Sequence, residues 1–116
     1  ACVRGDSIIA DGSASAPDII KIDVEGCELK VLNGLKNTLH RTHPLVITEY
    51  SPYRMECAGI GLSDVLDFMG SCGYGQFGRI EPSGNVVMVD DSDLERGCDM
   101  VFIPNEADFK LLFGMN

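Results

Sequence analysis

The chain has 116 residues, a length that suits a single domain, and 45% of them are hydrophobic, as in ordinary globular proteins. Eighteen acidic residues against nine basic ones give it a formal net charge of −9. Nucleic acid and anionic membrane surfaces are therefore poor partners, because the sequence has no basic stripe and no basic–aromatic pattern. No apolar run is long enough to span a membrane.

The five cysteines are odd in number, and no two of them have the close spacing of a zinc or redox motif. We therefore expect mostly buried free thiols, a pattern typical of a cytoplasmic protein. The cysteines are Cys2, Cys27, Cys57, Cys72 and Cys98.

Near the amino end, Asp6 or Ser7 is expected to cap a short helical turn. An almost unbroken apolar run then predicts a strand over residues 18–24, of the kind that is buried on both faces of a parallel sheet. Three acids, Asp23, Glu25 and Glu28, gather where this strand should end. In an open α/β sheet ligands bind beyond the carboxyl ends of the strands, so these carboxylates are expected at the rim of a site.

Leucines at near-helical spacing predict one helix over residues 27–42, which Pro44 stops. A second buried strand is predicted at 45–50, with Glu49 near its carboxyl end on the same rim as Asp23. Residues 53–61 are expected to form a loop over that rim, and a second helix is predicted from about residue 62 to 69.

The apolar period then changes to two, which predicts strands at 74–80 and 85–89 joined by a hairpin turn over 81–84. A polar connection, a final strand at 100–103 and an apolar helical tail at 107–115 are expected to follow. The predicted fold class is α/β: a mixed sheet with two parallel βα units and a late antiparallel hairpin, equivalent to half of a larger doubly wound fold.

The sequence from Pro17 to Glu28 (PDIIKIDVEGCE), followed by Val-Leu-Asn-Gly-Leu at 31–35, resembles the signature of the FkbM-type methyltransferases. That family's pattern is roughly Lys-Ile-Asp-Val-Glu-Gly-Ala-Glu and then a Val-Leu-x-Gly helix, with Cys27 here in the place of the usual alanine. The glutamate that ends the second strand and the Gly-Tyr pair at 73–74 match as well. The resemblance covers about residues 5 to 104.

The resemblance implies a Rossmann-like methyltransferase that moves a methyl group from S-adenosylmethionine to a hydroxyl oxygen of a small molecule, sugar or lipid. It assigns the catalytic role to Asp23 and Glu25 and cofactor binding to Asp6 and Asp23. It assigns acceptor binding to Glu28 and Glu49. No resident metal is expected.

Complete family members carry a glycine-rich cofactor loop in an earlier half, and no Gly-x-Gly-x-x-Gly occurs in this sequence. We therefore expect residues 1–116 to be a single, incomplete, carboxyl-terminal portion of the methyltransferase domain. Its first strand would then have an open edge, which favours self-association.

Two alternatives stay open at this point. The chain could be a non-catalytic α/β interaction module, in which Asp23 forms an internal salt bridge with Lys21 or Arg79. It could also hold a hard cation between Asp23, Glu25, Glu49 and a histidine, because such ions prefer oxygen ligands.

Overall fold

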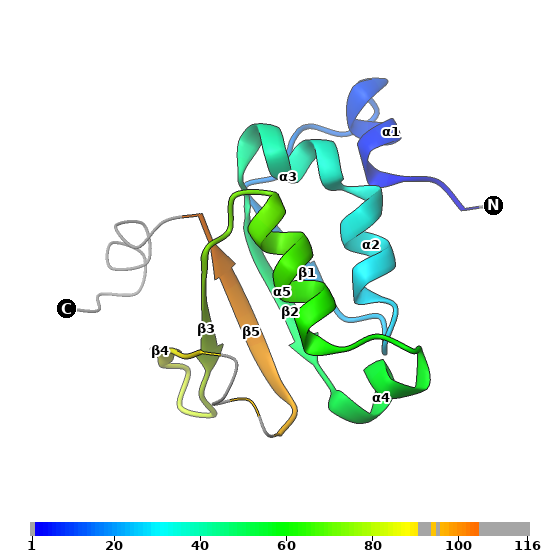
Figure 1. Ribbon diagram of the computed structural model, residues 1–116. Coiled ribbons are helices and arrows are strands. Elements are labelled where there is room, and N and C mark those ends of the chain that lie inside the picture. Colours follow the sequence, from blue (N-terminus) through cyan, green and yellow to red (C-terminus); the bar gives the residue numbers. More distant parts are fainter. Residues whose placement is uncertain (1, 91–93, 95, 105–116) are drawn as a thin grey trace.

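The computed structural model describes residues 2–90, 94 and 96–104, which form a five-stranded mixed sheet and several helices (Figure 1). The spatial order of the strands is β1-β2-β5-β3-β4. In chain order the elements are α1 (Gly5–Ala10), β1 (Ile19–Ile22), α2 (Glu28–Gly34), α3 (Lys36–Thr42), β2 (Leu45–Tyr50), α4 (Pro52–Cys57), α5 (Leu62–Ser71), β3 (Gln76–Ile80), β4 (Val86–Met88) and β5 (Cys98–Ile103).

The strand directions confirm the predicted mixed sheet. β1 and β2 are parallel, and both β2 and β3 are antiparallel to β5, so β1, β2 and β3 run in the same direction. β4 returns antiparallel to β3 as the second strand of the hairpin. The last of the described strands, β5, therefore lies at the centre of the sheet, between the parallel pair and the hairpin.

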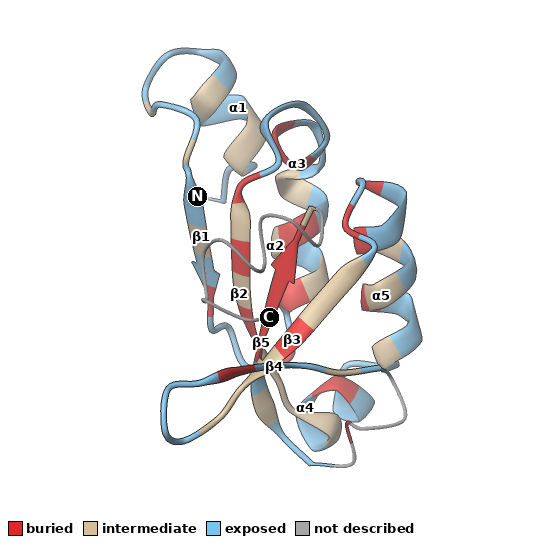
Figure 2. Cartoon of the chain, turned by 90° about the vertical axis from the view of Figure 1, so that its left-hand side faces the viewer, coloured by how far each residue is buried: buried red, intermediate tan, exposed pale blue. Residues whose placement is uncertain are grey.

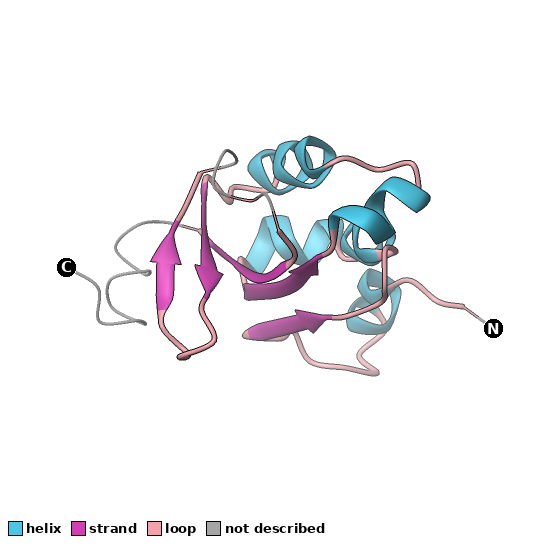
Figure 3. Cartoon of the chain, turned by 90° about the horizontal axis from the view of Figure 1, so that it is seen from below, coloured by secondary structure: helices cyan, strands magenta, loops and turns pink. Residues whose placement is uncertain are grey.

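The main core lies between one face of the sheet and the helices, and Figure 3 shows helices and strands as separate layers. Alternate residues of β2 and β5, such as Val46 and Phe102, point into this layer because side chains alternate between the two faces of a strand. Leu32, Leu39 and Met69 meet them from α2, α3 and α5, and each is fully buried. A smaller cluster around Val86, Val101 and Ile103 covers part of the other face.

β1 lies at one edge of the sheet, and the prediction that it is buried on both faces is wrong (Figure 2). Ile22 is 3% exposed, but Ile19 is 62% exposed on the opposite face. An apolar run indicates that a strand can be buried, but it does not indicate how many elements cover that strand. Among the described strands β1 pairs only with β2. In this part of the chain β1 therefore has the expected open edge.

The single helix predicted over residues 27–42 is wrong, because the chain forms α2 and α3 with a break at Leu35. Gly5 of α1 packs against Leu35 so closely that an added Cβ would lie 2.3 Å from its side chain. The Asp6 carboxylate then accepts hydrogen bonds from the backbone N–H groups of Asn37 and Thr38 and from the Thr38 hydroxyl. Asp6 therefore caps α3 rather than its own helical turn, and α1 holds the break in place.

Residues 73 and 74, which follow α5 in the chain, contact the two residues that precede β2. Gly73 has a φ of 96°, and a Cβ at this position would lie 2.8 Å from the His43 ring nitrogen Nε2. The buried Tyr74 hydroxyl donates a hydrogen bond of 2.5 Å to the Pro44 carbonyl oxygen. Burial raises the pKa of Tyr74 above its ordinary value, so the phenol remains a donor at neutral pH.

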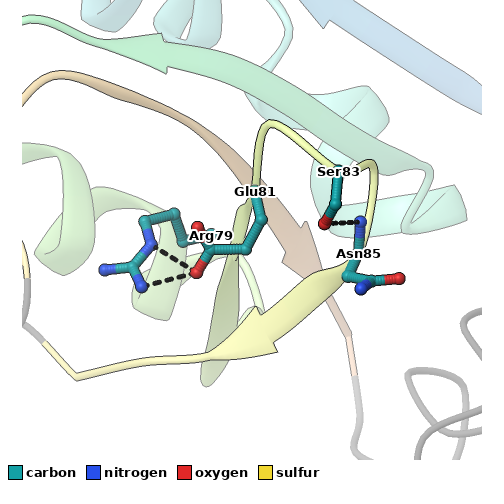
Figure 4. Close-up of polar contacts among 4 residues, drawn as sticks. All are labelled: Arg79, Glu81, Ser83 and Asn85. Atoms are coloured by element: carbon teal, nitrogen blue, oxygen red, sulfur yellow. Dashed lines mark hydrogen bonds and ion pairs between the residues drawn. The ribbon is translucent and has the colours of Figure 1, made fainter.

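The predicted hairpin is confirmed, although its strands are shorter than expected. Arg79 donates two hydrogen bonds to one carboxylate oxygen of Glu81 at the start of the turn, and the Asn85 backbone N–H donates to the Ser83 hydroxyl (Figure 4). The final strand is longer than the predicted 100–103, because Cys98 and Asp99 pair with the carboxyl end of β2. The predicted tail at 107–115 lies outside the described residues.

The prediction of mostly buried cysteines is wrong. All five are free, but Cys2, Cys27 and Cys57 are exposed and only Cys72 is buried. Sequence hydrophobicity does not report whether a short loop or a helix end faces the solvent. In the described residues no helix has the length and apolar character needed to cross a bilayer.

We predict that Asp6→Ala destabilises the protein at pH 7 by about 1–2 kcal/mol, because α3 loses its cap. Partial burial tends to raise the pKa of Asp6, but the hydrogen bonds from Thr38 and Asn37 outweigh it and lower that pKa below its ordinary value. The stabilisation is therefore complete above the ordinary aspartate pKa of about 3.9 and is lost as the pH falls towards the lowered value. Urea unfolding at several pH values measures it.

The matched control is Asp67→Ala, which removes an exposed aspartate from α5. The control should cost much less than Asp6→Ala at pH 7. An equal loss for the two variants, or a difference that does not shrink below about pH 4, would contradict the capping role.

Candidate functional site

The candidate site is built on the turn over residues 23–28, which connects β1 to α2. Glu25 and Gly26 both have positive φ angles, of 55° and 104°, and the Cys27 backbone N–H donates to the Val24 carbonyl oxygen at 3.4 Å. Glycine tolerates this conformation, whereas a glutamate at positive φ is uncommon and has to be held there.

Glu28, the first residue of α2, holds the turn from inside. Its side chain is only 4% exposed, and its Oε2 accepts a hydrogen bond from the Gly26 N–H at 2.9 Å. Its Oε1 is 3.4 Å from the Val24 N–H, which is a long hydrogen bond. A buried carboxylate needs such donors, because an unpaired one would be strongly disfavoured.

The short helix α4 packs on the outside of this turn, where a loop was predicted. A Cβ on Gly26 would lie 2.9 Å from the Arg54 carbonyl oxygen, so only glycine permits this close approach. The Arg54 guanidinium forms an ion pair of 3.3 Å with Glu25. Both side chains are about half exposed or more, at 47% and 67%, so this pair contributes little to stability. Its geometry nevertheless turns Glu25 towards α4.

Asp23 and Glu49 come together at the carboxyl ends of the two parallel strands. Ile22 pairs in register with Thr48, and these two acids are the residues that follow. Asp99 of β5 is the register partner of Glu49 on its other side. The hydrogen bond between the Glu49 and Asp23 side chains raises the pKa of Glu49, and partial burial and repulsion from Asp23, Asp99 and Glu28 raise it further.

Two carboxyl groups that share a hydrogen bond must share a proton, since two carboxylates have only acceptor oxygens. Asp23 is exposed and Glu49 is half-buried, so the raised pKa belongs to the less accessible member of the pair. Carboxyl pairs of this kind serve as acid–base groups in enzymes.

Two neighbouring hollows lie next to this end of β2. A pocket of about 350 Å³ is lined by Tyr50, Met55, Glu56 and Leu62, among others, from β2, α4 and the start of α5. A small cavity of about 10 Å³ shares three of these residues and reaches Glu28 and Glu49. The pocket therefore continues from the surface towards the acidic pair.

The largest of the described pockets, about 450 Å³, lies elsewhere, between α1 and α3. It is lined by residues such as Asp6, Thr38 and Arg41. Figures 1 and 2 both show α1 and α4 at opposite ends of the molecule, so this pocket is remote from the turn at 23–28. Its Asp6 and Thr38 side chains already bond to each other.

The structure thus joins some of the predicted site residues and separates others. It brings Asp23 and Glu49 together, with Glu28 buried behind them. Glu25 faces Arg54, and Asp6 is at the other end of the molecule. The alternative of a metal site is wrong for the described residues, which contain no group of three or more His, Cys, Asp or Glu side chains arranged for an ion.

Sequence reasoning missed Thr48, Arg54 and the helix that carries Arg54. A signal for α4 was present, because Ser51 precedes Pro52 and proline is favoured in the first turn of a helix. Thr48 gave no signal of its own, since threonine is common in strands.

We predict that Gly26→Ala destabilises the protein by about 1–3 kcal/mol more than Gly59→Ala. Both glycines have positive φ angles, so both substitutions incur the cost of a left-handed alanine. Only at Gly26 does the new Cβ meet backbone atoms, whereas Gly59 has open space around it. Urea unfolding of the two variants measures the difference, and equal losses would mean that α4 does not pack on the turn.

Comparison with known proteins gives two matches. The family model described as the Methyltransferase FkbM domain matches residues 1–75, which include the turn at 23–28 and Glu49. The curated hexuronic acid methyltransferase AglP of Haloferax volcanii is 36% identical over 45 residues, which are 39% of this chain and 19% of that protein. The chain thus matches about a fifth of the length of this relative. No solved structure matches.

Proposed function

Because this chain belongs to the FkbM methyltransferase family, we propose that it transfers a methyl group from S-adenosylmethionine to a hydroxyl oxygen of a small molecule, sugar or lipid. We propose further that its sheet is the carboxyl-terminal part of a Rossmann-like methyltransferase domain. The parallel β1–β2 pair joined through helices supports this, because such units build doubly wound folds.

The observation that carries the proposal is the carboxyl pair of Asp23 and Glu49 at the carboxyl ends of neighbouring parallel strands. S-adenosylmethionine supplies the methyl group when it is bound, and its positive sulfonium suits the negative charge gathered at this edge. Asp23 accepts the proton that the acceptor hydroxyl loses as its oxygen bonds to the methyl carbon. Glu49, at the end of the neighbouring strand, orients the Asp23 side chain.

The remaining predicted site residues have supporting roles in this proposal. Glu28 fixes the backbone of the turn, Gly26 lets α4 pack against it beside the acceptor pocket, and Glu25 is turned towards Arg54. A direct contact of Glu25 or Glu28 with the acceptor stays a prediction. So does a contact of Asp6 with the cofactor, since its carboxylate is already bonded to the start of α3.

The pocket of about 350 Å³ is the proposed acceptor site. Its lining includes the apolar surfaces of Met55, Ile60 and Leu62 and the ring of Tyr50, with Glu56 as its charged group. A sugar ring offers apolar C–H faces together with hydroxyl donors, which suits such a lining. No lining residue is basic, so a neutral acceptor is favoured over a carboxylate-bearing one.

The test is methyl transfer by the protein expressed from its natural gene, with product measured by mass spectrometry on a neutral methyl glycoside and on the matching uronate. We expect transfer to the neutral glycoside to be the faster of the two. Asp23→Asn should lower kcat by about 10²–10⁴-fold, because a carboxamide cannot take up the proton.

Asp67→Asn, on the exposed side of α5, is the control and should leave the rate unchanged. Full activity of Asp23→Asn would overturn the role of Asp23. A faster reaction on the uronate would overturn the choice of a neutral acceptor, and an absence of transfer to any hydroxyl compound would favour the non-catalytic interaction module.

The open edge of β1 supports the proposal that this chain self-associates. Ile19 is 62% exposed on this strand, and an unpaired edge offers its N–H and C=O groups to another strand. Light scattering over a range of concentrations should show dimers or larger species. Ile19→Lys should weaken the association, because charges on edge strands oppose pairing, and a monomer at every concentration would contradict this proposal.

A further inference from the structure

Thr48 has a buried hydroxyl whose hydrogen-bonding capacity is unused in the described part of the chain. The residue lies in β2 and is only 2% exposed, and its Oγ1 has no hydrogen-bond partner there. Burying a hydroxyl without a partner is unfavourable, and native proteins rarely tolerate it. A valine would have nearly the same shape in this strand without that cost, so the hydroxyl needs an explanation.

The small cavity of about 10 Å³ lies against this residue. Its volume is close to the minimum of roughly 10–15 Å³ that one water molecule needs. The walls come from α2, β2, α4, α5 and β5, and they include Glu28 and Thr48. The remaining wall comes from Glu49 and Tyr50 and from the hydrocarbon of Met55, Leu62, Val65 and Met100.

Glu28 provides the second polar group at this cavity. Its Oε2 is well satisfied by the Gly26 N–H at 2.9 Å, whereas among the described residues its Oε1 has only the long contact of 3.4 Å with the Val24 N–H. A carboxylate oxygen can accept two hydrogen bonds, so Oε1 has acceptor capacity left. A threonine hydroxyl can both donate and accept.

We propose that one water molecule binds in this cavity and bridges the Thr48 hydroxyl to the Glu28 carboxylate. The water donates one hydrogen bond to the Glu28 carboxylate and forms a second hydrogen bond with the Thr48 hydroxyl. This bridge ties the turn that carries Asp23 to the strand that carries Glu49. Thr48 is therefore a positioning residue for the acidic pair. This positioning role rests on the proposed function, whereas the water site is independent of it.

Such a bridge complements the register of β1 and β2. Register fixes the two strands up to Ile22 and Thr48, but Asp23 lies beyond the last residue of β1. The turn also contacts its neighbours through the Asp23–Glu49 pair and through the packing of Gly26 on α4. A water between Glu28 and Thr48 adds a hydrogen-bonded link at the point where Asp23 and Glu49 must meet.

The first test compares Thr48→Val with Thr48→Ser by thermal unfolding. If Thr48 holds the water, the valine variant loses the bridge and leaves the buried Glu28 short of a donor. Its Tm then falls below the Tm of the unchanged protein and of the serine variant. If the hydroxyl has no partner, the valine variant removes an unfavourable buried group, and its Tm rises above that of the unchanged protein. The two hypotheses therefore predict opposite signs, and a raised Tm overturns the proposal.

The second measurement detects the water in the unchanged protein, so it does not depend on a variant that folds. A nuclear Overhauser contact between a long-lived water and the Thr48 methyl group is expected, and its absence overturns the water site. In Thr48→Val the Gly26 amide should exchange with solvent at least several-fold faster, while the Gly84 amide in the distant hairpin keeps its rate.

A third measurement tests the positioning role separately. In the methyl-transfer assay, Thr48→Val should lower kcat with little change in KM for the acceptor, and Thr48→Ser should restore the rate. If the water is detected but kcat is unchanged in Thr48→Val, the positioning role is overturned and the water site stands. If no transfer occurs in any variant, the proposed function fails, while the unfolding and resonance measurements still decide the water site.

Discussion

The structure around the candidate site depends on one interaction, in which the buried Glu28 carboxylate accepts the backbone N–H of Gly26 and, over a longer distance, that of Val24. This carboxylate keeps two consecutive residues, Glu25 and Gly26, at positive φ angles and so reverses the chain between β1 and α2. The helix begins at the residue that stabilises the turn before it. Strand, turn and helix are therefore positioned together.

Two consequences of this turn meet at the carboxyl end of the sheet. Asp23 is held beside Glu49, where mutual hydrogen bonding and repulsion raise the pKa of Glu49. The bare backbone of Gly26 lets α4 approach, and α4 forms one wall of the pocket next to the acidic pair. Two neighbouring carboxyl groups and a pocket of about 350 Å³ thus lie close together because of a six-residue turn. A family relationship established over residues 1–75 agrees with a chemical role for this region.

A second carboxylate organises the opposite end of the molecule in a similar way. Asp6 reaches from α1 to the start of α3, where it satisfies two backbone N–H groups that the helix leaves unpaired. The break between α2 and α3 is stable because a residue more than thirty positions away supplies the cap. Glu28 and Asp6 therefore both complete backbone hydrogen bonding, although the sequence analysis expected each of them to bind a ligand.

Local periodicity and turn chemistry were enough to predict the alternation of strands and helices, the late hairpin and the gathering of acids after the first strand. The sequence also placed Asp23 and Glu49 at the same rim, since parallel strands align their carboxyl ends. The folded chain, in contrast, was needed to show that Glu28 faces inward, that Asp6 caps a distant helix and that α4 forms where a loop was expected. It also showed that β1 is an exposed edge and that most cysteines face solvent. These outcomes depend on which partners reach each group from elsewhere in the chain, and the pattern of neighbouring residues carries no record of such long-range contacts.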